Sequence, residues 1–180
     1  MDASAATPAA VRVDRDIEFE TYVVDRQNSL LRTAYLLTGS QQSAEDLVQT
    51  ALAKLYLAWH RVHDTASLDA YVRRIMVNEH TSWWRRAWRR NETSVDVLPE
   101  HRSQPRDAAH DVGERDAMWT LVQTLPPRQR AAVVLRFYED LSEQQTADTL
   151  NCSVGTVKSQ TSRAIAALRT RLQDERGADR

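Results

Sequence analysis

Residues 141–172 read LSEQQTADTLNCSVGTVKSQTSRAIAALRTRL, and their pattern predicts two helices joined by a sharp turn. Ser142, with Gln145 three residues later, has the spacing of a capping box and marks the start of a short helix. Asn151 follows that helix where the chain must turn, and asparagine tolerates left-handed backbone angles. Ser153 is expected to cap a last helix. This arrangement is typical of a helix-turn-helix.

The second of these helices carries polar side chains suited to a DNA groove. Val154 and Val157 are spaced to pack it back onto Ala147 of the first helix. Residues 153–173 contain four basic residues and no acidic one, and a positive face beside hydrogen-bonding groups is what recognition of the major groove requires. An ordinary helical hairpin with a solvated polar face shares the bare pattern. The residues expected to contact DNA are Ser153, Thr156, Lys158, Ser159, Gln160 and Arg163.

A second basic segment lies earlier in the chain and is rich in tryptophan. Residues 71–90 contain six arginines and one acidic residue. Arg85 and Arg89 are four residues apart and share one helix face. Aromatic rings interleaved with guanidinium groups suit unstacked bases, because the rings stack on the bases and the arginines hold the phosphates. Trp83 and Trp84 are adjacent, so one of them is expected in the core, although spacing alone does not say which.

The remaining pattern predicts helices separated by two disruptions. Apolar residues recur at spacings of three and four from about residue 17 to 90 and again from 114. Gly39 interrupts the first run, and Ser43 and Ser67 are expected to cap the helices that follow. The expected fold is all-α, with two small helical domains joined by a flexible acidic linker. The boundaries are a disordered tail at 1–13, the first domain at 14–90, the linker at 91–113, the second domain at 114–173 and a C-terminal tail at 174–180.

Composition excludes several classes of protein. The 24 basic and 25 acidic residues give a net charge of −1, so the chain as a whole is not strongly basic. A single cysteine, Cys152, excludes a disulfide framework. No apolar run approaches the length of a membrane span, and the N-terminus lacks a secretory signal, so a cytoplasmic protein is expected. The five scattered histidines, a missing triad context and a missing glycine-rich phosphate loop predict no enzyme, no metal and no cofactor.

Three segments together resemble a bacterial RNA polymerase sigma factor of the sigma-70 family. They are AEDLVQTALAKLYLAW (44–59), DAYVRRIMVNEHTSWWRR (69–86) and the long segment 125–169 that begins LPPRQRAAVV. The order of the three, with an acidic linker before the last, is similar to the small extracytoplasmic-function class (group IV) and its SigE-like actinobacterial group. The resemblance covers about residues 17–173. It implies a helical region 2, which includes the first two segments, and a helix-turn-helix region 4.

The resemblance also implies partners and site residues. Region 2 would bind the coiled coil of the β′ clamp of core RNA polymerase, region 4 would contact the β flap, and an anti-sigma factor is a possible further partner. The loop at 61–67 matches the one with which the family captures a flipped −10 base. The polymerase-binding residues would be Asp46, Gln49, Thr50 and Lys54. Region 4 would read the −35 element, and region 2 would contact the −10 element through Arg61, Arg73, Arg74, Asn78, Trp83, Trp84, Arg85, Arg86 and Arg89.

The alternative function is a stand-alone helix-turn-helix regulator that binds duplex DNA without polymerase. It explains residues 141–172 but neither the tryptophan-rich basic helix nor the match of 44–59 to a polymerase-binding helix. The alternatives differ in what the free protein does. A stand-alone regulator binds its operator unaided, whereas a sigma factor needs polymerase to hold its two DNA-reading parts at promoter spacing.

Overall fold

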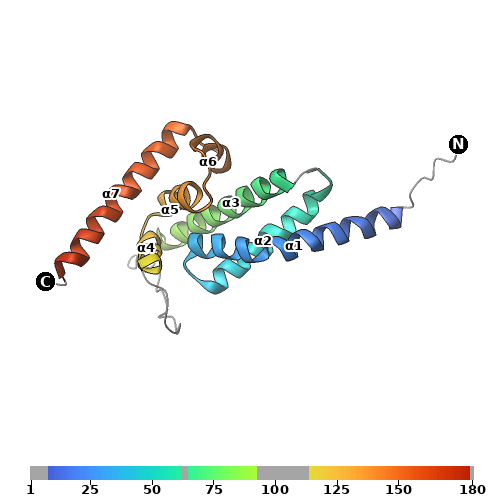
Figure 1. The fold of residues 1–180 in the computed structure, drawn as a ribbon, viewed down its shortest axis with the longest axis horizontal. Helices are drawn as coiled ribbons and strands as arrows, with labels where there is room; N and C mark the ends of the chain where they lie inside the picture. Colours follow the sequence, from blue (N-terminus) through green and yellow to red (C-terminus); the bar gives the residue numbers. More distant parts are fainter. Residues whose placement is uncertain (1–7, 62–64, 93–113, 179–180) are drawn as a thin grey trace.

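The computed structural model describes residues 8–61, 65–92 and 114–178, and within them all regular secondary structure is helical (Figure 1). The expected all-α fold is therefore confirmed. The N-terminal unit comprises α1 (Pro8–Thr38), α2 (Gln41–Ala58), the 3₁₀ turn η1 (Trp59–Arg61) and α3 (Thr65–Glu92). The C-terminal unit comprises α4 (Glu114–Gln123), α5 (Pro127–Val133), the π-helical turn η2 (Val134–Tyr138), α6 (Glu143–Leu150) and α7 (Val154–Ala178). None of the described helices is long and apolar enough to cross a membrane.

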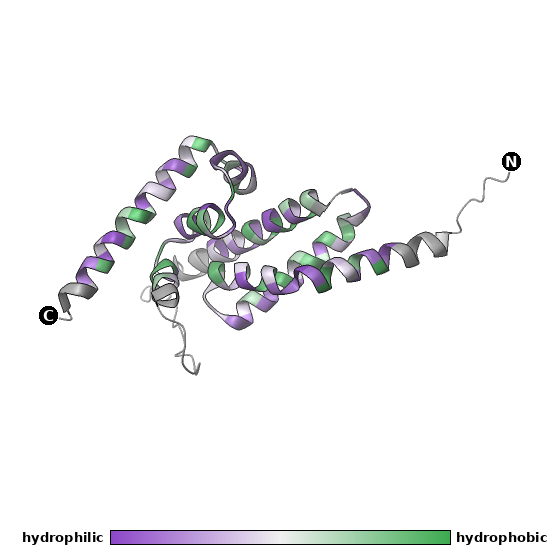
Figure 2. Cartoon of the chain, in the orientation of Figure 1, coloured by the Kyte–Doolittle hydropathy of each residue, from purple (hydrophilic) through white to green (hydrophobic). Residues whose placement is uncertain are grey.

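Apolar stripes hold the N-terminal unit together. Buried side chains recur every three or four residues along α1, α2 and α3, which is the period that places them on one face of a helix. The most deeply buried are Ala34, Leu37, Leu47, Ala51, Leu55, Val72 and Met76. Figure 2 shows hydrophobic and hydrophilic residues alternating along these helices. The three helices therefore pack around one shared apolar core.

Glycine ends the first helix as expected, but the predicted caps are displaced. Gly39 has a φ of +77°, and its N–H donates to the Tyr35 carbonyl at 2.8 Å, which is a common way to end a helix. The cap of α2 is Ser40, whose Oγ accepts from the Ser43 N–H at 3.4 Å, so the expectation that Ser43 is the cap is wrong by one turn. Helix α2 begins at Gln41, right after Ser40, because the two glutamines between Ser40 and Ser43 do not disfavour a helix.

Two further boundaries differ from the sequence-based expectation. Helix α3 begins at Thr65, so Ser67 lies inside its first turn and does not cap it. Helix α1 begins at Pro8, so residues 8–13, expected in a disordered tail, are helical. The expected linker lies outside the described residues except for its first two positions, which extend α3 to Glu92.

The C-terminal unit is organised around α5. Pro127 occupies the start of α5, where its missing N–H costs nothing. Helix α5 contacts α7 on one side and α1 and α3 on the other (Figure 1). The π-helical turn that follows is closed by the Glu139 N–H, which donates to the Val134 carbonyl at 3.0 Å. The helix pair α6–α7 follows this turn along the chain.

The two units meet at the C-terminal end of α1. Helix ends leave carbonyl groups without partners inside the helix, and here the other unit supplies donors. Gln123 Nε2 donates to the Leu36 carbonyl at 2.8 Å, and the Arg130 guanidinium donates to the Leu37 carbonyl at 2.8 Å. One continuous cluster of buried apolar residues runs through both units. The units therefore share a core in this structure.

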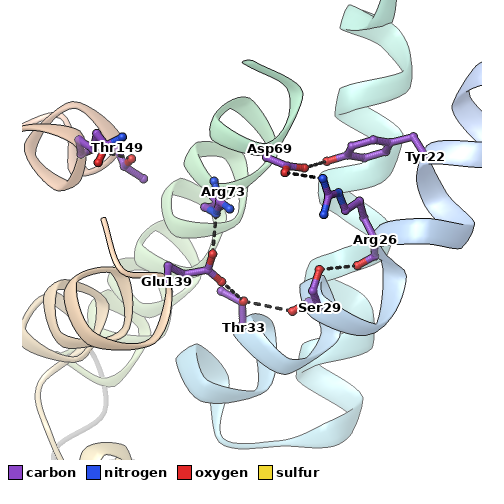
Figure 3. Close-up of polar contacts among 9 residues, drawn as sticks. Tyr22, Arg26, Ser29, Thr33, Asp69, Arg73, Glu139 and Thr149 are labelled. Atoms are coloured by element: carbon purple, nitrogen blue, oxygen red, sulfur yellow. Dashed lines mark hydrogen bonds and ion pairs between the residues drawn. The ribbon is translucent and has the colours of Figure 1, made fainter. Parts of the chain in front are cut away.

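A polar triad ties α1 to α3. The phenol of Tyr22, which is 6% exposed, donates to Asp69 Oδ1 at 3.0 Å, and the Arg26 guanidinium lies 3.2 Å from Asp69 Oδ2 (Figure 3). Burial, and then the charge of Asp69, raise the pKa of Tyr22 above its usual range. The phenol therefore stays neutral and keeps donating to the carboxylate.

Replacing Tyr22 with phenylalanine tests this triad. Tyr22→Phe should lower the free energy of unfolding by about 1–2 kcal/mol at pH 8, because a hydrogen bond to a charged acceptor is lost. The raised folded pKa means that the stabilisation is complete below about pH 10 and is lost as pH rises beyond it. Urea unfolding at pH 8 and pH 10.5 should therefore show a smaller difference between the variant and the wild type at the higher pH.

The matched control is Tyr71→Phe, because Tyr71 is 38% exposed on the same bundle. It should leave stability nearly unchanged at both pH values. A gap between Tyr22→Phe and wild type that is the same at both pH values would contradict the assigned role of Tyr22.

Candidate nucleic-acid interface

The turn between α6 and α7 has the geometry that the sequence predicts. Ser142 and Gln145 form the complete capping box: the Ser142 N–H donates to Gln145 Oε1 at 2.8 Å, and the Gln145 N–H donates to Ser142 Oγ at 3.2 Å. Asn151 sits at φ 50° and ψ 53°, in the left-handed region. The Cys152 N–H closes the turn on the Ala147 carbonyl at 3.0 Å. The helix-turn-helix is therefore built as expected.

Packing then fixes which face of α7 is open. Ala147 and Val157 are buried between the two helices, with Val154 half-buried beside them. Farther along, Ala164 and Leu168 continue the buried stripe against the rest of the unit. Figure 2 shows hydrophilic residues interleaved with this stripe along α7. The opposite face of α7 points away from the protein.

The residues expected to read the −35 element fall into two groups. Thr156, Lys158 and Arg163 are exposed, whereas Ser159 and Gln160 are half-buried. Ser153 is exposed, but its side chain caps the start of α7, because its Oγ accepts from the Thr156 N–H at 3.1 Å. The Lys158 ammonium lies 3.4 Å from a carboxylate oxygen of Glu143 on α6. The exposed group is thus the part of α7 available to a DNA groove.

Helix α3 presents a second polar face. Arg74, Asn78 and Arg85 are all exposed, and their spacing of four and seven residues places them along one side of the helix. Tyr71, three residues before Arg74, continues that line and is 38% exposed. Sequence reasoning missed Tyr71, although the same spacing rule would have found it. Together these residues form what is called the α3 stripe below.

The structure separates the two adjacent tryptophans. Trp83 is half-buried and packs against the apolar core, whereas Trp84 is 39% exposed. Of the pair, Trp84 is therefore the ring with surface left to offer to a base. Arg86 is exposed, and one of its guanidinium nitrogens donates to Ser82 Oγ at 2.9 Å.

Two other expected −10 contacts, Arg73 and Arg61, contact protein side chains. Arg73 is half-buried and forms an ion pair with Glu139 of the C-terminal unit, 2.6 Å from Nε to Oε2. Arg61 is exposed at the end of η1, and its Nε donates to His60 Nε2 at 3.3 Å. Arg89 belongs to α3, and its side chain lies outside the part of the chain that the structure describes. Residues 62–64 of the expected base-capturing loop lie outside the described residues.

The face of α2 expected to bind polymerase is exposed. Asp46 and Gln49 are exposed and Thr50 is half-buried. Lys54 is exposed but paired with Glu79 of α3. Leu57 lies on the same line as Asp46, eleven residues later, and is 75% exposed. A large apolar side chain amid a polar rim is typical of a protein interface, and sequence reasoning did not identify Leu57.

The described residues include possible metal ligands and one cysteine thiol. No group of three or more histidine, cysteine, aspartate or glutamate side chains among them is placed to hold a metal ion. Cys152 is half-buried in the helix-turn-helix, and desolvation raises the pKa of its thiol despite the opposing charge of Arg128. A raised pKa keeps the thiol neutral and unreactive at physiological pH.

Known proteins match both units. The family description "Sigma-70 region 2" matches residues 22–90, and "Sigma-70, region 4" matches residues 115–168. The chain is 44% identical over 156 residues to the RNA polymerase sigma-E factor of Streptomyces coelicolor, covering 87% of this chain and 86% of that relative. It is 41% identical over 157 residues to the sigma-E factor of Streptomyces avermitilis, with the same coverage.

A solved structure shares the fold. The sigma factor RpoE of Bartonella quintana, determined in complex with the anti-sigma factor NepR, matches with a TM-score of 0.67 at 26% identity, covering 87% of this chain and 97% of that one. The two family matches together span more than half of the chain, and the Streptomyces relatives cover most of it. The chain belongs to the sigma-70 family of RNA polymerase sigma factors, in the extracytoplasmic-function class.

Proposed function

We propose that this protein binds core RNA polymerase in the cytoplasm and directs promoter-specific initiation of transcription, as a binding factor with no catalytic site of its own. The observation that carries the proposal is the presence of two different exposed polar faces, each suited to nucleic acid, on the two units of one chain. The acid-free face of α7 suits duplex DNA, and the α3 stripe with Trp84 suits unpaired bases.

The face of α7 is suited to reading the −35 element as a duplex. A helix held by a helix-turn-helix enters the major groove with its N-terminal residues against the base edges. Thr156 and Lys158 lie in the first two turns of α7, and Arg163 follows on its exposed side. Arginine recognises guanine through two hydrogen bonds, and lysine contacts phosphate as a point charge. Gln160 is half-buried but close enough to this face to be tested as a base contact.

The α3 stripe is suited to holding the melted −10 strand. Opening a promoter requires that the bound complex prefers the separated strand to the duplex, because only differential affinity shifts an equilibrium. A ring such as Trp84 contributes about 1–3 kcal/mol by stacking on an exposed base. Arg74 and Arg85 supply phosphate contacts along the same helix, and the Asn78 amide has the donors and acceptor to recognise a base edge.

Polymerase is the partner proposed for α2. Asp46, Gln49 and Leu57 form an exposed surface that combines polar groups with one large apolar side chain, as protein interfaces do. We propose that this surface contacts the β′ clamp and that the C-terminal unit contacts the β flap. An anti-sigma factor is a further proposed partner, because the matching Bartonella sigma factor was solved with one.

Mapping of transcription start sites tests the proposed function. The purified protein is added to core polymerase with a genomic DNA library, and the 5′ ends of the transcripts are sequenced. Discrete starts that depend on the protein and share elements near −35 and −10 are expected. Absence of both protein-dependent starts and core binding would instead favour the stand-alone regulator.

Two double variants should separate polymerase binding from promoter opening. Arg85→Ala with Arg86→Ala should reduce promoter opening about tenfold or more, because phosphate contacts to the melted strand are lost, and should leave core affinity unchanged. Asp46→Ala with Gln49→Ala should reduce core affinity and leave opening by the preformed complex unchanged. Permanganate footprinting measures opening and fluorescence anisotropy measures core binding. If both variants lose both activities equally, the assignment of the two faces is wrong.

Substitutions on α7 should change promoter choice. Gln160→Ala or Arg163→Ala should alter the base preference at −35, with about tenfold loss at the position each contacts, because a good base contact contributes about 1–3 kcal/mol of discrimination. Gln173→Ala and Arg169→Ala, which remove the same side chains later on α7, are the matched controls and should keep the wild-type preference. Selection from a randomised −35 library provides the measurement. An unchanged preference in the first pair removes those residues from the reading face.

A further inference from the structure

The N-terminal half of α1 is bound to the end of α2 by a polar contact. The Tyr56 hydroxyl donates to Asp16 Oδ1 at 2.8 Å, although the two residues are 40 positions apart in the chain. The Arg15 guanidinium donates to the same hydroxyl and lies 4.6 Å from the centre of the Tyr56 ring. The last turn of α2 is therefore fixed to α1 just before the chain enters η1.

Aromatic packing continues this contact into η1. Trp59, the first residue of η1, is 8% exposed. Its ring meets Phe19 edge to face with the centroids 5.2 Å apart, and it meets Tyr22 with the centroids 5.5 Å apart. Phe19 also packs against the Tyr56 ring at 5.0 Å. Edge-to-face pairs have a preferred geometry in addition to the apolar area they bury, so these rings orient η1 relative to α1.

The same stretch of α1 also holds the start of α3. Asp69, in the second turn of α3, accepts from the Tyr22 hydroxyl and pairs with Arg26 (Figure 3). Asp16 and Arg26 are ten residues apart on one helix, which is a rise of about 15 Å. One continuous helix therefore sets the placement of η1 relative to α3. The contacts of α1 with the end of α2, with η1 and with the start of α3 are together called the α1 clasp.

Arg61 is the exposed cation whose placement depends on this clasp. It is the last residue of η1, two residues after the buried Trp59, and the partner of its Nε is its neighbour His60. Thr65, where α3 begins, is four residues later, so the two backbones lie within about 14 Å of each other. Arg61 is therefore close to the beginning of the helix that carries the α3 stripe.

An arginine reads bases selectively only when its backbone is held in place. The guanidinium recognises guanine through two hydrogen bonds of fixed geometry, but the side chain has many rotamers, and ordering them reduces the binding free energy. A recognition residue therefore needs supporting contacts that fix its position before the ligand arrives. In this structure those contacts come to η1 from α1.

We propose that the α1 clasp positions η1 so that Arg61 discriminates between bases of the −10 element, which makes Asp16, Tyr56 and Trp59 positioning residues for promoter choice. The inference rests on the proposed function for its consequence, but the clasp itself is independent of it. Its members act through Arg61, because Trp59 is buried and the hydroxyl of the half-buried Tyr56 is bound to Asp16. Loss of the clasp should therefore change base preference at −10 and not affinity for core polymerase.

Hydrogen exchange of the full chain, followed by mass spectrometry, tests the clasp without polymerase or DNA. Tyr56→Phe keeps the ring and removes the hydroxyl, and it should speed exchange in peptides covering residues 57–61 about threefold or more, because local opening becomes easier. Exchange in α7 should stay unchanged, which shows that the variant remains folded. Tyr138→Phe is the matched control: it removes the same hydroxyl at a 37% exposed position of the C-terminal unit and should leave residues 57–61 unchanged. If Tyr56→Phe exchanges like the wild type, the proposal is overturned.

The functional arm selects transcribed promoters from a library randomised around −10. Arg61→Ala should reduce discrimination about tenfold at the base that Arg61 contacts. Tyr56→Phe should reduce discrimination at the same base about threefold, because Arg61 is then ordered less well. Base preference at −35 and core affinity should keep their wild-type values, and a merely destabilised protein would not show this combination. Asp16→Ala should match Tyr56→Phe, and the double variant should lose no more than either single one, because both substitutions remove one contact.

Three outcomes of the selection count against the inference. The proposal is overturned if Tyr56→Phe keeps the wild-type preference at −10, if Arg61→Ala keeps it, or if the two variants lose discrimination at different bases. A clasp that loosens as expected in hydrogen exchange, in a protein that yields no protein-dependent transcription starts, would overturn the proposed function and with it the role of Arg61, but not the clasp.

Discussion

The buried guanidinium of Arg130 is the contact on which the arrangement of this chain depends. It is 6% exposed and donates to the Leu37 carbonyl at the end of α1, to Gln123 and to the Leu125 carbonyl at 3.1 Å. Desolvation lowers its pKa to about 10, so it remains charged at neutral pH. A cation is favourable at the negative end of a helix dipole. One side chain thus orders the turn before α5 and joins the two units.

Local rules predicted much of the fold because local interactions determine those features. The capping box at Ser142 and the left-handed turn at Asn151 depend on neighbouring residues alone, and the structure has both. The starts of α2 and α3 were displaced because several adjacent polar residues can each cap a helix, as Ser40 and Ser43 show. The interface around Arg130 and Glu139 joins residues about one hundred positions apart, and no periodic pattern along the chain encodes such a pairing.

Helical spacing predicted which helix faces carry the candidate residues. It did not predict which of their side chains are exposed and which are held by other parts of the fold. The α3 stripe follows from helical spacing, and Arg73, next to Arg74, lies about 100° around the helix from it and pairs with Glu139 of the C-terminal unit. Trp83 and Trp84 have the same local context, and only tertiary packing decides that the second keeps 39% of its surface. Tyr71 and Leu57 were missed because an apolar or aromatic residue on a helix is ordinarily assigned to the core, and exposure depends on which neighbours the fold supplies.

The ion pair between Lys158 and Glu143 has a consequence for how DNA binding responds to salt. A free ammonium that meets a phosphate displaces a condensed cation from the DNA, and each such displacement steepens the dependence of affinity on ionic strength. Lys158 already has an anionic neighbour at 3.4 Å, so its transfer to a phosphate exchanges one anion for another and frees a carboxylate that attracts a cation in turn. The net number of cations released on binding is then smaller than the number of phosphates that α7 contacts. A helix-turn-helix with this internal pairing binds DNA less steeply with salt than its number of basic residues suggests.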